Sequence, residues 1–192
     1  MKEYLVEGKK MNVKLSSIAV LSGLILFSQT LLADGFTLKS DDMQGQISTS
    51  QVFNGFGCTG KNISPQLSWE NAPKGTKSFA ITVYDPDAPT GSGWWHWLVF
   101  NISKDAKNIS ANSSASHTLP SGSIESITDY AKSGFGGACP PQGDKAHSYI
   151  TTIHALDVEK LKLNKDSNPA LVGYMISAHT LEKSSVIAYY KR

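Results

Sequence analysis

Residues 79–100 read FAITVYDPDAPTGSGWWHWLVF, so two apolar segments flank a polar loop. A period of two places Phe79, Ile81 and Val83 on one face of a first strand. The prolines of the loop cannot donate hydrogen bonds to a sheet ladder, so the chain must leave the sheet between the two segments. This stretch therefore predicts two strands joined by a loop.

The second apolar segment also alternates. It predicts a strand with one face made of Trp94, His96, Leu98 and Phe100. A lone histidine on such a face is more often a hydrogen-bonded core residue than a ligand, and Asp-Pro pairs often open turns. Convergence favours a functional interpretation, because the two strand ends bring Asp85 and Asp87 close to the His96 imidazole and the indole rings.

The N-terminus has the order of a secretory signal peptide. Lysines precede an apolar run over residues 15–32, which ends before the small residue Ala33. We expect cleavage after Ala33 and a periplasmic or secreted protein. Polar residues interrupt the run, so no stable membrane span is predicted. Either Met1 or Met11 can be the start, and Met11 opens the more ordinary signal sequence.

Residues 34–192 are expected to form a single domain with a net charge of about zero. Four of the 18 basic and two of the 16 acidic residues lie in residues 1–33, which leaves 14 of each. No basic stripe remains for nucleic acid or an anionic membrane surface. The only arginine is the last residue, Arg192, so histidine, lysine or backbone amides would have to hold an anion.

Cys58 and Cys139 are the two cysteines of the chain. In an oxidising compartment a disulfide between them is the economical interpretation, and two separate buried thiols are the alternative. The disulfide would close a loop of about 80 residues, worth about 4 to 5 kcal/mol in the chain-entropy model. No CxxC spacing or thiolate cluster indicates zinc.

The remaining pattern indicates short strands separated by turns. Strands are predicted over residues 36–40, 64–69, 79–84, 94–102, 148–156 and 186–190. Residues 102–123 are polar and are expected to form a long surface excursion. Asn168 is the expected N-cap of a helix from Pro169 to about Thr180. The apolar stripe of this helix is expected to comprise Leu171, Val172, Met175 and Ile176. Together these elements predict a sandwich or barrel with a peripheral helix.

A second cluster of chemically useful residues lies in residues 129–149, DYAKSGFGGACPPQGDKAHSY. Its glycines allow the backbone to approach a ligand and to aim successive N–H groups at an anion. It is not a Walker loop, because no Gly-Lys-Ser/Thr follows. His147 and Tyr149 share one face of the next strand, so both are expected to point into the same cavity as His96.

Two ordered motifs carry a resemblance to a known family. The motifs are Asp85-Pro86-Asp87-Ala88-Pro89 followed by His96, and Gly136-Gly137-Ala138-Cys139-Pro140-Pro141-Gln142-Gly143 followed by His147-Ser148-Tyr149. With the segment Asn62-Ile63-Ser64-Pro65 and Trp69, they resemble the phosphatidylethanolamine-binding protein family, also called the Raf kinase inhibitor protein family. The exported bacterial branch is the most similar, and the resemblance covers nearly all of residues 34–192.

The resemblance implies a mainly β fold, with a large antiparallel sheet packed on a smaller sheet and a C-terminal helix. It also implies a small pocket for phosphate, sulfate, acetate or a phosphoethanolamine headgroup, without a cofactor or metal and without room for acyl chains. The residues implied in or beside this pocket are Asp85, Asp87, Pro89, Trp95, His96, Gly137, Ala138, Cys139, His147 and Tyr149.

Individual roles follow from the same resemblance. The expected anion donors are His96 and the backbone N–H groups of residues 137–139. Asp85 is expected to orient His96 or to receive an ammonium group. Trp95 and Tyr149 are expected to wall the opening.

Two departures from the family pattern matter. Many members have His-Arg where this chain has His147-Ser148, so a role of that arginine does not transfer. Cys139 stands where eukaryotic relatives often have glycine, so a disulfide would fix the rim of the pocket here.

Three classes of function are open. The pocket favours an exported protein that binds a small anion or phospho-headgroup. The alternative is an interaction protein that inhibits or modulates a partner such as a protease or a host protein. Kinase inhibition, the eukaryotic activity, is not expected of an exported chain. A homodimer is compatible with the resemblance, because exported bacterial relatives are often dimeric.

Catalysis is the remote alternative. Asp85, His96 and His147 could form a hydrolytic constellation or a two-His-one-carboxylate metal site. The sequence has neither a Gly-x-Ser-x-Gly elbow nor a His-Glu-x-x-His helix, so we do not expect an enzyme.

Overall fold

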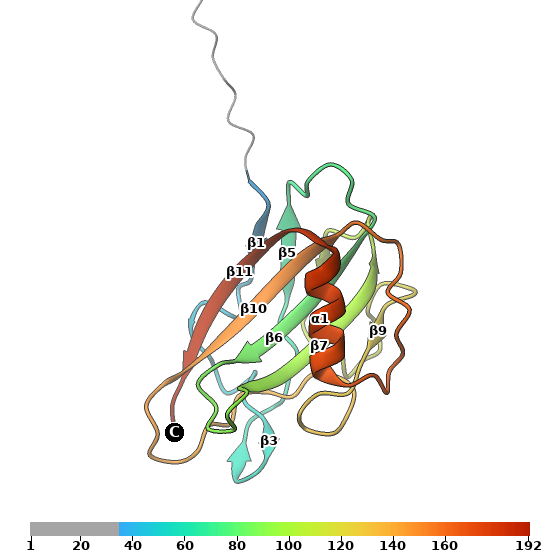
Figure 1. The fold of residues 1–192 in the computed structure, drawn as a ribbon. Coiled ribbons are helices and arrows are strands. Elements are labelled where there is room, and N and C mark those ends of the chain that lie inside the picture. The colour runs from blue at the N-terminus through green and yellow to red at the C-terminus, as the bar shows by residue number, and fades with distance from the viewer. Residues whose placement is uncertain (1–34) are drawn as a thin grey trace, which may run out of the picture. The chain divides into compact units, whose positions relative to one another are not determined.

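The computed structural model describes residues 35–192, and Figure 1 shows their fold. The predicted signal segment and its cleavage site lie outside the described residues. Among residues 35–192, no helix has both the length and the apolar character needed to cross a membrane.

The main sheet is built around the two strands that residues 79–100 predict. Its six strands, in spatial order, are β2 (Gly45–Gln46), β11 (Thr180–Tyr190), β10 (His147–Leu156), β6 (Ser78–Asp85), β7 (Trp94–Ser103) and β9 (Ile124–Glu125). All pairings in it are antiparallel except that of β2 with β11. The strands predicted over residues 79–84, 94–102 and 148–156 are confirmed to within one or two residues.

A three-stranded antiparallel sheet covers one face of the main sheet. It consists of β1 (Thr37–Lys39), β5 (Leu67–Glu70) and β8 (Asn108–Ile109). The core between the sheets includes Leu38, Leu67, Trp69, Phe79, Ile81, Val83, Trp97, Val99 and Ile153. The predicted sandwich of a large sheet on a smaller one is confirmed, as is the shared face of the three apolar residues of β6.

Helix α1 (Pro169–His179) covers the opposite face of the main sheet (Figure 1). Asn168 caps it, because its side chain accepts a hydrogen bond of 2.9 Å from the backbone N–H of Ala170. Val172 and Ile176, one turn apart, are buried against the sheet. The helix and its cap are confirmed, but Leu171 is 47% exposed. The predicted stripe was too wide because only one narrow side of α1 meets the sheet.

A β-bulge at His96 changes which residues of β7 share a face. Val83 and Tyr84 are adjacent on β6, yet their partners on β7 are two residues apart. An extra residue reverses the alternation of everything beyond it. The side chains of β7 that pack toward the helix are Trp95, Leu98 and Phe100. The prediction that Trp94, His96, Leu98 and Phe100 share one face is therefore wrong beyond the bulge.

The segment 102–123 is more than a surface excursion. It supplies β8, and Ile109, Ser113 and Ser114 within it are buried. The Ser114 hydroxyl accepts a hydrogen bond of 2.9 Å from the backbone N–H of Phe135. The segment thus supports the glycine-rich loop through this hydrogen bond, a role that the polar composition of the segment did not indicate.

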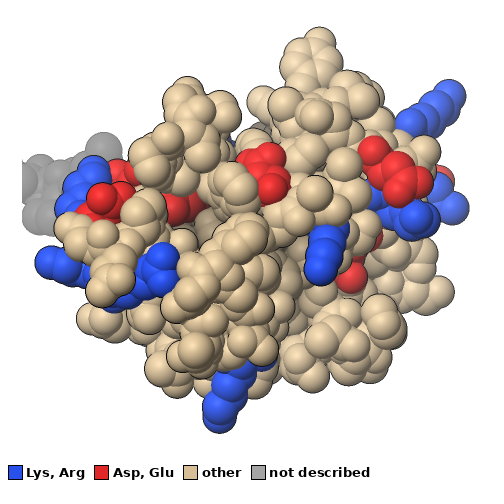
Figure 2. Space-filling model, turned by 90° about the horizontal axis from the view of Figure 1, so that it is seen from below, with Lys and Arg blue, Asp and Glu red and all other residues tan. Residues whose placement is uncertain are grey.

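Charged side chains of opposite sign lie close together on the surface. Lys39 pairs with Glu70 at 3.4 Å, and Lys145 pairs with Asp87 at 2.6 Å. On the face viewed from below in Figure 2, uncharged side chains predominate and the charged ones stand in small separate groups. This distribution agrees with the near-zero net charge expected for the domain.

Candidate functional site

The strand ends of the main sheet surround a pocket of about 210 Å³. β6 ends at Asp85, β7 begins at Trp94 and β10 begins at His147. Antiparallel neighbours place these three ends at one edge of the sheet. The residues that line the pocket are Phe56, Asp85, Ala88, Pro89, Thr90, Trp94, His96, Tyr130, Cys139, Pro140, Pro141, His147 and Tyr149.

Asp85 and His147 form a buried pair in the pocket wall. The Asp85 carboxylate lies 2.8 Å from His147 Nδ1, and the two residues are 3% and 1% exposed. Its other oxygen accepts a 2.8 Å hydrogen bond from the backbone N–H of Asp87. The prediction that Asp85 orients His96 is therefore wrong, because the carboxylate is directed at the histidine of β10 instead.

His96 presents a hydrogen-bond acceptor to the pocket. Its Nδ1 lies 2.8 Å from the carbonyl oxygen of Gly136, which can only accept, so Nδ1 carries the proton and Nε2 has a free lone pair. Burial lowers the pKa of His96, although the carbonyl of Gly136 and the carboxylates of Asp85 and Asp129 oppose this effect. In the free protein the ring is therefore neutral at pH 7.

Two aromatic residues supply donors that lack a partner. Tyr149 OH and Trp94 Nε1 are buried, and neither donates a hydrogen bond to a group among residues 35–192, although the Cys139 N–H lies where it can donate to the Tyr149 oxygen. Both side chains line the pocket. Burial raises the pKa of Tyr149, with a further contribution from the Asp85 carboxylate, so the hydroxyl keeps its proton at neutral pH. Buried polar groups are nearly always hydrogen-bonded, so these two are suited to a bound molecule.

Two of the three loop amides expected to bind an anion, those of Gly137 and Ala138, are bonded within the protein. Gly137 N–H donates to Asn62 Oδ1 at 2.7 Å, and Ala138 N–H donates to the carbonyl of Gln51 at 3.0 Å. A Cβ on Gly137 would lie 2.3 Å from the Gln51 oxygen. The expectation that the amides of Gly137 and Ala138 bind an anion is wrong, because both are already bonded within the protein.

Replacing Gly137 with alanine is expected to lower the free energy of unfolding by about 1 to 3 kcal/mol, because backbone must move to admit the methyl group. Urea denaturation of the variant measures this loss. Gly35→Ala is the matched control, since a Cβ there meets nothing within 4 Å. Equal denaturation midpoints for the two variants would contradict the close packing.

Trp95 lies outside the pocket. Its ring packs against Tyr84, with centroids 4.5 Å apart, and a Cβ on Gly173 of α1 would lie 3.1 Å from it. The expected wall role is therefore wrong for Trp95 and belongs to Trp94. Trp94 and Trp95 are adjacent in the strand, so the ordinary alternation before the bulge directs them to opposite faces.

Asp87 secures the loop after β6 and does not line the pocket. One oxygen accepts hydrogen bonds from the Ser148 N–H at 2.9 Å and hydroxyl at 2.5 Å, and the other pairs with Lys145. These interactions, with Lys145 first, hold the pKa of Asp87 well below its usual range. Ser148 and Lys145 thus fasten this loop.

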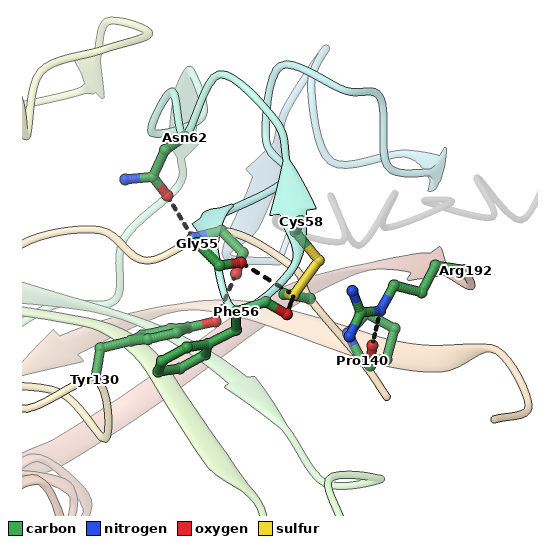
Figure 3. The surroundings of a disulfide bond; sticks show 9 residues. Gly55, Phe56, Cys58, Asn62, Tyr130, Pro140 and Arg192 are labelled. Carbon is green, nitrogen blue, oxygen red and sulfur yellow. Dashed lines mark hydrogen bonds between the residues drawn. A yellow bond between two sulfur atoms is a disulfide. The ribbon is translucent and has the colours of Figure 1, made fainter. Parts of the chain in front are cut away.

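The predicted disulfide between Cys58 and Cys139 is confirmed, with a Cα–Cα distance of 6.0 Å. β3 (Asn54–Gly55) and β4 (Cys58–Thr59) form a hairpin with Phe56 at its tip. The bond ties this hairpin to the rim beside Pro140 (Figure 3). Arg192, the last residue of the sequence, lies at this rim, where its Nε donates a hydrogen bond of 2.6 Å to the carbonyl of Pro140.

The sequence did not single out several lining residues. Trp94 shares the His96 side of the strand before the bulge, so the alternation already indicated it. Tyr130 lies in the second cluster, and its hydroxyl donates to the carbonyl of Gly137 at 2.8 Å. Phe56 lies two residues before Cys58, so the predicted disulfide was a usable signal for its position.

Among residues 35–192, Asp85 pairs with His147 and not with His96. Within the described residues, no group of three or more His, Cys, Asp or Glu side chains is arranged to hold a metal ion. Asp85 and His147 bond to each other, whereas His96 bonds to the Gly136 carbonyl.

Comparison with known proteins gives consistent matches. The family model described as phosphatidylethanolamine-binding protein matches residues 39–191. The UPF0098 proteins YbcL and YbhB of Escherichia coli K12 are 44% identical over 176 residues and 46% identical over 140 residues, respectively. These alignments cover 91% and 72% of this chain, and 96% and 88% of the two relatives.

Solved structures agree with the sequence matches. The crystal structure of Escherichia coli YbcL, described as a new member of the mammalian PEBP family, superposes with a TM-score of 0.80 at 45% identity. The superposition covers 82% of this chain and 98% of the YbcL chain. A putative family homologue from Chlamydia trachomatis shares the fold, with a TM-score of 0.68 at 23% identity. This chain belongs to the phosphatidylethanolamine-binding protein family.

Proposed function

We propose that this protein binds a small anion or a phosphorylated headgroup in the pocket beside His96. The observation that carries the proposal is the pair of buried, unpartnered donors, Tyr149 OH and Trp94 Nε1, in a pocket that also contains His96. A phosphate can accept from both donors. A protonated phosphate oxygen can in turn donate to His96 Nε2, or the imidazole can take up a proton on binding.

The zwitterion phosphoethanolamine suits this arrangement well. Its phosphate group would occupy the side of Tyr149 and His96, and its ammonium group would approach the Asp85 carboxylate. The pocket volume of about 210 Å³ is below the usual range of about 300 to 1,000 Å³ for drug-sized ligands, so a headgroup fits and acyl chains do not.

Binding is favoured over hydrolysis by the state of the pocket's aliphatic hydroxyl. Thr90 is the serine or threonine that lines the pocket, and its Oγ1 donates to the carbonyl of Gly93 at 2.6 Å. It is thus not activated by a histidine, as a nucleophile would be.

The second candidate function, recognition of a protein partner, is favoured by Phe56, which is 68% exposed at the pocket rim.

The same proposal places the protein outside the cytoplasm. The signal-like residues 1–33 and the disulfide support an exported protein, because disulfides persist in oxidising compartments. Recovery of the processed chain from a periplasmic or culture fraction, with a new N-terminus at Asp34, is the expected result. An unprocessed N-terminus in the cytoplasmic fraction would contradict this part of the proposal.

The test of ligand binding is an NMR titration of the purified protein with phosphate and with O-phosphoethanolamine. Saturable shifts are expected in residues 85–97 and 134–149. His96→Ala is expected to weaken binding about tenfold or more, because a hydrogen bond to a charged group contributes about 1.5 to 3 kcal/mol.

His179→Ala is the matched control, since His179 lies at the end of α1 and pairs with Asp157. Unchanged phosphate affinity in the His96 variant, or no saturable shift at millimolar phosphate, would reject the proposed site. A partner that co-purifies only with the unaltered pocket would instead favour the second candidate.

A further inference from the structure

A second hollow of about 530 Å³ adjoins the headgroup pocket. Phe56 and Tyr130 line both cavities, so these two rings form a shared wall. The rings are stacked with centroids 5.7 Å apart, and Figure 3 shows them side by side. Phe56 is also 68% exposed, so this shared wall is open to solvent at the Phe56 ring.

The second hollow has a basic character that the first lacks. Lys61 and Lys132 both line it, whereas no aspartate or glutamate does. Neither ammonium group forms an ion pair within residues 35–192. The acidic residues nearest in sequence to Lys132 do not line the hollow, and they accept hydrogen bonds from other residues: Asp129 from the Trp95 N–H at 2.7 Å and Glu125 from Trp97 Nε1 at 2.6 Å.

The backbone that carries both lysines is held in place. Asn62, next to Lys61, accepts from the Gly137 N–H at 2.7 Å and donates to the Phe135 carbonyl at 3.1 Å. The carbonyl of Lys132 accepts a hydrogen bond of 3.0 Å from the Thr128 N–H. Two lysines from separate segments thus border one hollow on well-held backbone, and this arrangement favours an anionic group there.

We propose that the second hollow is an anion subsite, and that the protein's preferred ligand is an elongated molecule with anionic groups at both ends. One end, a phosphate, occupies the headgroup pocket. The linker crosses Phe56 and Tyr130, and the distal anion is bound by Lys61 and Lys132. This inference rests on the proposed function, because it takes the first end of the ligand to lie beside His96.

The test compares α,ω-alkanediol bisphosphates of two to eight carbons with alkyl monophosphates of the same chain length, by calorimetry and NMR with the whole protein. At the length that spans both cavities, the bisphosphate is expected to bind at least about tenfold tighter than its monophosphate, because the second contact becomes intramolecular. This gain is expected to shrink as ionic strength rises, since both lysines are exposed to solvent.

The double variant Lys61→Met/Lys132→Met is expected to remove the gain while leaving inorganic phosphate affinity unchanged. Lys160→Met/Lys162→Met, which changes the net charge equally at exposed positions outside the second hollow, is the control. A bisphosphate gain that survives in the Lys61/Lys132 variant, or its absence at every chain length while phosphate still binds, would overturn the inference alone. Loss of phosphate binding itself would instead reject the proposed function.

Discussion

Replacing Cys58 and Cys139 together with alanine is expected to lower the free energy of unfolding by about 4 kcal/mol. The two residues are 81 positions apart, and in the chain-entropy model a loop of this length in the unfolded chain accounts for a loss of that size. Native domains are stable by only about 5 to 15 kcal/mol, so the change is a large share of the total. Urea denaturation at pH 7 measures it through the shift in midpoint.

The same replacement is expected to weaken phosphate binding. The disulfide joins the hairpin that carries Phe56 to the segment of the pocket rim that contains Pro140, and both residues line the pocket. Without it, the two sides of the rim are no longer held together covalently, and part of the binding free energy goes into ordering them. A variant with an unchanged midpoint and unchanged phosphate affinity would show that the disulfide supports neither the fold nor the rim.

The β-sandwich followed from the sequence because its strongest signals are local. A period of two, the prolines of the loop after β6 and the Asn168-Pro169 start of α1 each act through neighbouring residues. The loop motifs of the family then located the edge of the sheet where the pocket lies. Six of the ten site residues expected there line the pocket in the structure: Asp85, Pro89, His96, Cys139, His147 and Tyr149.

The bulge at His96 could not be predicted from the same rules. Nothing in the run of residues 94–100 marks an extra residue, because tryptophan, histidine and leucine suit either face of a strand covered on both sides. Only the pairing of Val83 and Tyr84 with β7 reveals the shift. That one residue moved Leu98 and Phe100 to the helix side of the sheet, away from the face of Trp94 and His96.

The bonding of the Gly137 and Ala138 amides could not be predicted for a related reason. A glycine permits close approach of its backbone, but its sequence does not say whether ligand or protein approaches. Here the partners are Gln51 and Asn62, more than seventy residues earlier in the chain than Gly137. Contacts between residues so far apart depend on the tertiary fold and cannot be predicted from the local sequence. The unpartnered donors Tyr149 OH and Trp94 Nε1 were therefore identified only from the structure.

The affinity for sulfate is expected to fall about tenfold for each pH unit above the pKa of His96 in the free protein. Sulfate carries no proton near neutral pH, so it can bind to His96 only after the imidazole has taken up a second proton. Burial lowers the pKa of this residue, so the protonated fraction at pH 7 is small. Calorimetric titrations with sulfate at intervals of about one pH unit, between pH 5 and pH 8, measure how steeply the affinity falls with pH.

Phosphate is expected to show a weaker pH dependence than sulfate, because its monoanion brings a proton that can be donated to the neutral Nε2. His96→Ala should abolish the difference between the two anions. The other ionisable side chains that face His96 are Asp85, Asp129, Tyr130 and Tyr149. Burial raises the pKa of both tyrosines, so their hydroxyls do not titrate in this range. Equal slopes for sulfate and phosphate in the unaltered protein would therefore place the titrating group elsewhere.

The pH dependence of the free energy of unfolding tests the protonation of His96 independently of affinity measurements. The unfolded chain binds a proton to His96 at its ordinary pKa of about 6.5, whereas the folded chain does so only at lower pH. The free energy of unfolding must therefore fall as the pH drops below about 6.5, and sulfate should restore part of it by stabilising the charged ring. His96→Ala should reduce this acid sensitivity without abolishing it, because burial also lowers the pKa of His154 to about 4. Restoration by sulfate that persists in the His96 variant would exclude His96 as the group that couples proton uptake to anion binding.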